Sequence, residues 1–176
     1  NEIDPNNFFL ARSNSYKLPA EIIRDNALAS SGLLVKKVGG PSVKPYQPDG
    51  LWLEKNSFSA DLYNYKKDSG DSLYRRGMYT FIKRTSPPPS MIALDGTSRE
   101  ECTVKREKTN TPLQALVLMN DPQFFEASRI LAERIQKEGG ENYLDQIKYG
   151  FRLAISRNPK DEELKLLKEL YESQLK

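Results

Sequence analysis

The chain has 176 residues, of which 38% are hydrophobic and 29% charged, and its formal net charge is +3. This length and composition predict one polar globular domain over residues 1–176 and no membrane span. A single cysteine excludes an internal disulfide and a cysteine-based zinc site, and the lack of histidine excludes Ser-His-Asp and Cys-His catalysis and the usual haem and zinc ligands. Since Asn1 is not an initiator methionine, we expect the chain to be a fragment of a longer protein.

The first predicted element is a helix over residues 20–38, after a polar and irregular start. Pro19 can open a helix at no cost in hydrogen bonds. Ile23, Ala27 and Leu34 recur at helical spacing along it. Gly39-Gly40-Pro41 is a strong stop signal, so we expect the helix to end near Val38.

Residues 41–70 predict a long loop, because three prolines and an Asp-Gly pair precede a stretch rich in tyrosine and serine. Trp52, the single tryptophan, lies inside this loop. A lone tryptophan in a loop more often plugs the core, and the alternative is a platform on which a ligand stacks.

Residues 71–84 fit a helix capped by Asp71-Ser72, with Tyr74, Met78 and Phe81 on one face. A strand is the alternative, since Tyr79 to Ile82 favour sheets. Three prolines at 87–89 predict an extended segment, and residues 91–104 are the best place for a short strand.

The most patterned stretch, KREKTNTPLQALVLMNDPQFFEA at 105–127, predicts two helices broken by a sharp joint. Thr111-Pro112 and Asp121-Pro122 are each a cap followed by a helix-opening proline. The first helix is apolar all round, so we expect it in the core with Leu113, Leu116 and Val117 inward.

The C-terminal third predicts three antiparallel helices joined by short connections. Their apolar stripes are Phe124, Ala127, Leu131 and Ile135, then Leu144, Ile147, Phe151 and Ala154, then Leu164, Leu167, Tyr171 and Leu175. The fold class is therefore mainly α, a helical domain with a long Pro/Gly-rich loop region and at most a short β element.

The positive charge is concentrated in residues 75–108, which carry a net +4. Arginines there suit an anion or sulfated-glycan pocket, but a solvated face with arginines that tie down loops is the commoner arrangement. Nucleic-acid binding is disfavoured because the excess is small. The candidate ligand-binding residues are Arg84, Arg99, Arg106, Asn110, Thr111 and Trp52, where Asn110 and Thr111 precede a helix N-terminus.

No catalytic constellation is evident. The adjacent carboxylates Glu100 and Glu101, and the pair Asp68 and Asp71, show no arrangement typical of a glycosidase, and no spacing resembles a Ca²⁺ loop. Cys102 has acidic neighbours, which do not favour a reactive thiolate, and we expect it to be buried and structural. We predict no metal site and no catalytic residue.

Four strings carry a family resemblance: LPAEIIRDNALASSGLL, GGPSVKPYQPDGLW, LYRRGMYTFIKRTSPPPSM and REKTNTPLQALVLMNDPQFFEAS. Together they resemble the C-terminal domain of unknown function in planctomycete-type cytochrome c-associated multidomain proteins. The resemblance covers most of the chain to about Arg134 and continues loosely through ISRNPKDEEL, and it implies that the start of this domain lies upstream of Asn1.

This resemblance implies an exported protein, periplasmic or on the cell surface, of bacteria that degrade polysaccharides. The haem lies in a separate domain of the parent protein, so we expect no cofactor in this chain. Partners would be the other domains of the parent, including the haem domain, and a carbohydrate or anion. The favoured function is a non-catalytic scaffold or ligand-binding module, and the alternative is part of an enzyme domain acting on extracellular carbohydrate.

Overall fold

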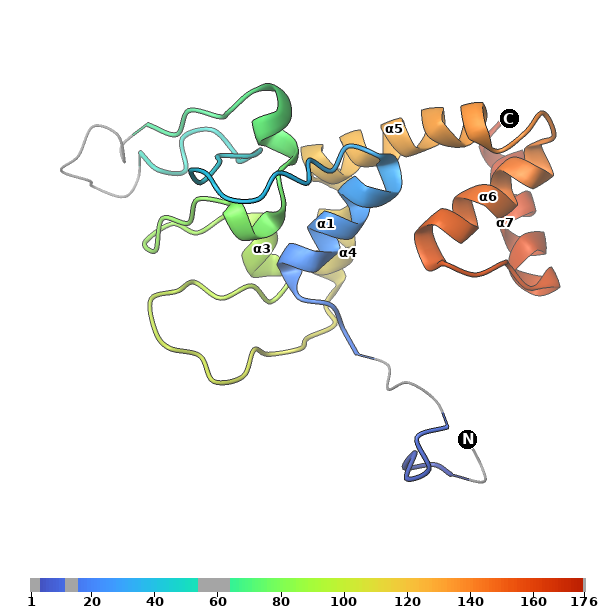
Figure 1. Ribbon diagram of the computed structural model, residues 1–176, viewed down its shortest axis with the longest axis horizontal. Helices are drawn as coiled ribbons and strands as arrows, with labels where there is room; N and C mark the ends of the chain where they lie inside the picture. The colour runs from blue at the N-terminus through green and yellow to red at the C-terminus, as the bar shows by residue number, and fades with distance from the viewer. Residues whose placement is uncertain (1–3, 12–15, 54–63, 176) are drawn as a thin grey trace.

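A computed structural model describes residues 4–11, 16–53 and 64–175, and it is mainly helical, as predicted (Figure 1). The elements are α1 (Ala20–Ser31), the 3-10 turns η1 (Gly70–Tyr74) and η2 (Gly77–Tyr79), α3 (Pro89–Ala93), α4 (Pro112–Asn120), α5 (Pro122–Glu138), α6 (Tyr143–Ile155) and α7 (Asp161–Gln174). Helix α5 joins α1, α3, α4 and the loops at one end to α6 and α7 at the other (Figure 1). No helix in the described ranges is long and apolar enough to cross a membrane.

Helix α1 is shorter than predicted, because it ends at Gly32 and not at Gly39-Gly40-Pro41. Gly32 takes a left-handed conformation with φ of 85°, and its N–H bonds to the Ala29 carbonyl. The chain beyond it is extended, and Val35 pairs with Arg75 in an isolated parallel bridge. The early glycine was therefore the true C-terminal signal.

The predicted helix over residues 71–84 was wrong, and so was the strand over 91–104. The first region forms η1 and η2, and then Val43 exchanges backbone hydrogen bonds with Tyr79 and Phe81. The second begins with the short helix α3, which Pro89 opens. The β structure of the described chain consists of isolated bridges, with Val43 opposite Thr80 in one of them.

The predicted joint in 105–127 is confirmed. Helix α4 ends at Asn120, and the Asp121 side chain accepts the Gln123 N–H at 2.9 Å to start α5. The inward placement of Leu113 and Leu116 was wrong, since these side chains are 58% and 54% exposed. Gln114 is instead the buried residue of α4.

The core lies where α1, α3 and α5 meet, with Ala20, Met91, Leu94 and Phe124 buried together. The C-terminal helices α5, α6 and α7 pack in succession as an antiparallel unit, as the short connections predicted. Gly150 of α6 faces Ile135 of α5 closely enough that a β-carbon would approach its Cδ1 to 2.6 Å. The body that surrounds α4 is thus built on α1 and the first half of α5.

Candidate ligand pocket

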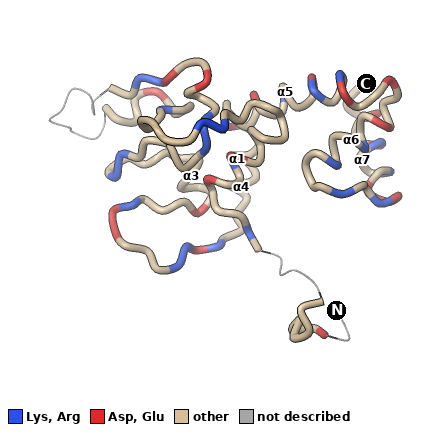
Figure 2. The backbone as a smooth tube through the Cα atoms, in the orientation of Figure 1, with Lys and Arg blue, Asp and Glu red and all other residues tan. Residues whose placement is uncertain are grey.

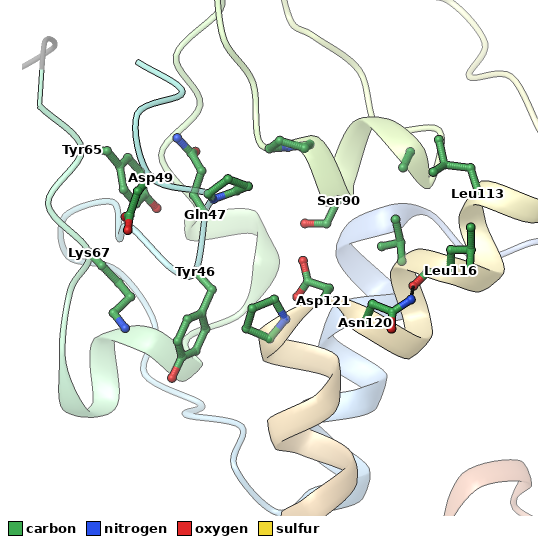
Figure 3. A pocket seen from close by; sticks show the side chains of 15 residues that line it. Tyr46, Gln47, Asp49, Tyr65, Lys67, Ser90, Leu113, Leu116, Asn120 and Asp121 are labelled. Atoms are coloured by element: carbon green, nitrogen blue, oxygen red, sulfur yellow. Dashed lines mark hydrogen bonds between the residues drawn. The ribbon is translucent and has the colours of Figure 1, made fainter. Parts of the chain in front are cut away.

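A hollow of about 680 Å³ lies between α4 and the loops that precede and follow the undescribed residues 54–63 (Figure 3). This volume is in the range of small-molecule binding pockets. Its residues come from four separate parts of the chain and are Tyr46, Gln47, Pro48, Asp49, Tyr65, Lys67, Pro89, Ser90, Ala93, Leu113, Leu116, Val117, Asn120, Asp121 and Pro122.

One wall of the hollow is apolar and is formed by α4 and α3. Leu113, Leu116 and Val117 lie on the same side of α4, because they are three or four residues apart, and Ala93 of α3 stands beside them. Such a wall suits the apolar face of a ligand, because the release of water from the two apolar surfaces favours binding.

The opposite wall is aromatic and polar. Tyr46, Gln47 and Asp49 belong to one loop, on the side of the hollow opposite α4 (Figure 3). The amide nitrogen of Gln47 is buried and has no hydrogen-bond acceptor among the described residues. A buried donor without an acceptor is costly, but this nitrogen is covered, so a ligand oxygen in the hollow would reach it only after the Gln47 side chain turned.

The tyrosines of this region are held as neutral phenols. Burial and the nearby Glu126 carboxylate raise the pKa of Tyr46, and the same two causes raise the pKa of Tyr74 to about 12. Tyr74 donates its hydroxyl to Glu126 at 3.0 Å. Burial, assisted by Asp68, also raises the pKa of Tyr65. These phenols are therefore hydrogen-bond donors and not bases at neutral pH.

The floor of the hollow is the joint between α4 and α5. Asp121 uses one carboxylate oxygen to cap α5, and it retains further capacity to accept hydrogen bonds. Ser90 of α3 and Asp121 project toward one another in Figure 3. Asn120 donates its amide to the Leu116 carbonyl at 3.0 Å, which leaves its amide oxygen as an acceptor at the rim.

The charge of the lining is low and of mixed sign. In the part of the chain that the structure describes, it contains the carboxylates of Asp49 and Asp121 and one cation, Lys67, whose ammonium lies 4.4 Å from the centroid of the Tyr46 ring. Among the described residues that line it, none is an arginine. The hollow is thus poorly suited to an anion and well suited to a neutral ligand with many hydroxyl groups.

The predicted arginines do not meet at one place. Arg106 binds Glu21 of α1 through both terminal nitrogens at 2.6 and 3.0 Å, and this pairing raises the pKa of Arg106 and lowers that of Glu21. Arg84 is exposed in the turn between Lys83 and Ser86. Arg99 is exposed in the loop after α3, where acidic and basic positions alternate (Figure 2).

Other arginines of the basic block tie down loops. Arg75 donates to the carbonyl of Pro41 at 2.7 Å and to that of Gly39, and its guanidinium lies 3.9 Å from the centroid of the Tyr79 ring. Arg76 pairs with Asp25 of α1 at 3.2 Å. This is the commoner of the two arrangements weighed from the sequence.

Asn110 and Thr111 are exposed at the entry to α4, next to a network of ordered contacts. The Asp95 carboxylate accepts from Lys17 at 2.6 Å and from the backbone and hydroxyl of Thr109 at 2.9 and 2.6 Å. These contacts hold the pKa of Asp95 well below its usual range. The network anchors the N-terminal end of α4, and neither Asn110 nor Thr111 lines the hollow.

Trp52 is 1% exposed. Tyr65 meets its ring edge-on with centroids 4.9 Å apart, Phe81 lies 5.6 Å away, and the ammonium groups of Lys44 and Lys83 lie within 5.5 Å of its centroid. A ligand would have to displace these neighbours to stack on the ring. The geometry therefore agrees with a tryptophan that fills the core, the first of the two interpretations of Trp52. Ligand binding by any of the six predicted residues stays a prediction.

Cys102 is exposed, so its expected burial was wrong. It lies in the loop after α3, where it has few neighbours to cover it. Within the described ranges, no three carboxylate or thiol side chains gather closely enough to hold a metal ion. The described residues of the hollow can form hydrogen bonds and apolar contacts with a ligand.

The residues of the hollow were not singled out from the sequence. The sequence predicted a loop around Tyr46 and Asp49 and a core position for the helix that begins at Pro112. The available signal was a tyrosine and a glutamine between Pro45 and Pro48, followed directly by Asp49. No local sequence pattern predicts that this loop lies opposite α4, because more than sixty residues separate the loop from the helix.

A family model described as "Protein of unknown function (DUF1553)", PSD1, matches residues 1–171. No curated protein matches the chain. No solved structure matches it either.

Proposed function

The chain belongs to the DUF1553 family of proteins of unknown function, and we propose that it is a non-catalytic module that binds a neutral carbohydrate in the hollow beside α4. The observation that carries the proposal is the pairing of an apolar wall with a wall of tyrosines and uncharged or acidic hydrogen-bonding groups. A pyranose ring has the matching form, with apolar C–H faces and a rim of hydroxyl groups.

Each wall has a definite role. Leu113, Leu116 and Val117 cover one face of the sugar ring. Asp49 and Asp121 accept hydrogen bonds from sugar hydroxyls, and the Gln47 amide donates to a sugar oxygen once its side chain turns toward the hollow. Within the described ranges the lining holds no arginine, which favours a neutral sugar over a sulfated one.

The test is calorimetric titration of the protein with neutral oligosaccharides of several linkages and with a sulfated counterpart. Asp49→Ala is the main variant, because Asp49 is exposed and its loss cannot unfold the core. Asp71→Ala, at an exposed aspartate outside the hollow, is the matched control. We expect at least about a tenfold loss of affinity for Asp49→Ala, since a hydrogen bond to a charged group contributes about 1.5–3 kcal/mol, and no loss for the control.

Two outcomes would overturn the proposal: no neutral saccharide binds, or binding is unchanged in Asp49→Ala. Binding restricted to the sulfated ligand would direct attention back to Arg84, Arg99 and Arg106. Chromatography of each oligosaccharide after incubation with the protein checks the non-catalytic part, because shortened products would favour the enzyme alternative.

The resemblance described above supports a wider proposal for the parent protein. We propose that this module is part of an exported, cytochrome c-associated multidomain protein whose haem lies in another domain. The chain itself has no histidine to serve as an axial ligand. The check is a haem-specific stain and cell fractionation of the parent protein, where a haem-free or cytoplasmic protein would contradict the proposal.

A further inference from the structure

The N-terminal arm, residues 4–11, presents apolar side chains to solvent. Phe8, Phe9 and Leu10 are each at least 81% exposed, and Figure 1 shows the arm standing clear of the helices. Isolated exposed apolar residues are common on proteins, but three in succession form a patch that is typical of a contact surface.

The arm is nevertheless ordered by its own hydrogen bonds. The Asp4 carboxylate accepts the N–H of Phe8 at 2.8 Å and that of Phe9 at 3.0 Å. Leu10 has a φ of 51°, a left-handed conformation that is rare for a large side chain. The arm thus holds a defined turn that keeps both phenylalanines outward, and such strain is found at sites that engage a partner.

The α4 surface, which consists of Leu113, Leu116, Leu118 and Met119, is the complementary feature. These side chains are 42–69% exposed on a helix with apolar residues on every side. A helix of this kind is normally covered. The α4 surface therefore lacks a cover in the arrangement described here.

The covalent chain brings the arm within reach of this surface. Lys17 donates to the Gln114 side chain of α4 at 2.8 Å, so the arm is tethered beside the start of that helix. Leu10 precedes Lys17 by seven residues, which span at most about 25 Å when extended. The nine residues of α4 rise about 14 Å, so the whole helix lies within reach. A short tether also gives the arm an effective concentration of about millimolar, which favours its own α4 over that of a second copy.

We propose that the N-terminal arm is a strap that closes on the α4 surface of its own chain, with Phe8, Phe9 and Leu10 packed against Leu113 and Leu116. Because Leu113 and Leu116 also line the hollow, the closed strap and a ligand compete for the same wall. Only this competition rests on the proposed function. The closure itself depends on the apolar surfaces alone.

Paramagnetic broadening tests the closure. A nitroxide is attached at Asn6→Cys in a Cys102→Ser background, since Asn6 and Cys102 are both exposed. We expect broadening of the methyl signals of Leu113 and Leu116 and none for Leu166, which is exposed on α7. The Phe8→Ser, Phe9→Ser, Leu10→Ser variant leaves the core intact and should abolish the broadening.

Unbroadened α4 methyls would overturn the proposal. A mixture of nitroxide-labelled protein and isotope-labelled, nitroxide-free protein distinguishes contact within one chain from contact between two copies. Broadening in the mixture would assign the contact to a second copy and overturn closure within one chain. The triple serine variant should bind saccharide more tightly by about threefold or more, because the strap no longer blocks the wall. If broadening occurs but no saccharide binds either form, the proposed function fails and the strap stands. Equal saccharide affinity of the two forms would overturn the competition.

Discussion

Arg24 on α1 donates its Nε hydrogen to the side-chain oxygen of Gln123 on α5 at 2.5 Å, and both residues are buried. The same guanidinium reaches the carbonyls of Leu73 and Arg75 at 2.8 and 2.6 Å. One side chain therefore joins α1 to α5 and to the loop around η1. Burial lowers the pKa of Arg24 to about 10, so it remains charged at neutral pH.

Replacing this arginine should destabilise the whole body around the hollow. Arg24→Met keeps the side-chain length but leaves the Arg75 carbonyl and the Gln123 side-chain oxygen without their donor, whereas the Leu73 carbonyl keeps the Gln123 amide at 3.1 Å. We expect a loss of about 2–4 kcal/mol in the free energy of unfolding. Urea denaturation followed by tryptophan fluorescence measures this loss, because Trp52 lies in the same body. Arg152→Met, at an exposed position on α6, is the matched control and should change stability by less than about 0.5 kcal/mol. A loss in Arg24→Met no larger than in the control would contradict the linking role of Arg24.

Asp121 has two separable roles, as the cap of α5 and as part of the floor of the hollow. Asp121→Ala should lower the free energy of unfolding by about 1 kcal/mol through loss of the bond from the Gln123 N–H. Asp121→Asn retains a capping oxygen and should be stable to within about 0.5 kcal/mol. Thermal denaturation of both variants checks the cap, and saccharide titration of the stable Asp121→Asn checks the charge. Equal stability of the two variants would contradict the capping role.

Asp95 should make stability depend on acid. Hydrogen bonds from Lys17 and Thr109 hold the pKa of Asp95 below its usual value of 3.8. A carboxylate with a lowered folded-state pKa adds stability above its unfolded pKa and loses that contribution as the pH falls through and below about 4. Asp95→Asn tolerates the φ of 64° at this position, since asparagine adopts it readily. The stability gap between wild type and Asp95→Asn should be largest above pH 5 and shrink toward pH 2, as measured by melting curves across that range. A gap that does not change with pH would show that the charge of Asp95 contributes nothing.

Alanine substitution should destabilise the protein at Gly96 and have little effect on its stability at Gly150. A β-carbon at Gly96 would lie 2.6 Å from the Met91 carbonyl oxygen, which belongs to the backbone of α3 and cannot move cheaply. A β-carbon at Gly150 would meet only the flexible end of Ile135, and alanine is the better helix former by about 1 kcal/mol. We expect Gly96→Ala to cost about 1–3 kcal/mol and Gly150→Ala to stay within about 1 kcal/mol of wild type. Urea denaturation ranks the two variants, and the reverse order would contradict the backbone clash at Gly96.

The sequence by itself determined what depends on neighbouring residues. Thr111-Pro112 and Asp121-Pro122 placed the starts of α4 and α5, because a cap and a proline act within one turn of helix. Periodic apolar stripes predicted α5, α6 and α7 and hence the mainly helical class. The sequence did not predict that α1 ends at Gly32, because Gly39-Gly40-Pro41 is the stronger helix-stop signal.

Only the tertiary structure decided which surfaces meet. The segment 71–84 had helical spacing, but Asp25 binds the Gly77 N–H at 2.6 Å and Val43 pairs with Tyr79 and Phe81, so contacts from distant residues outweighed local propensity. The exposure of α4 and the hollow it shares with Tyr46 likewise depend on pairings far apart in the chain. Local patterns encode the ends and faces of helices, whereas the partner of a face is chosen by the free energy of the whole packed body.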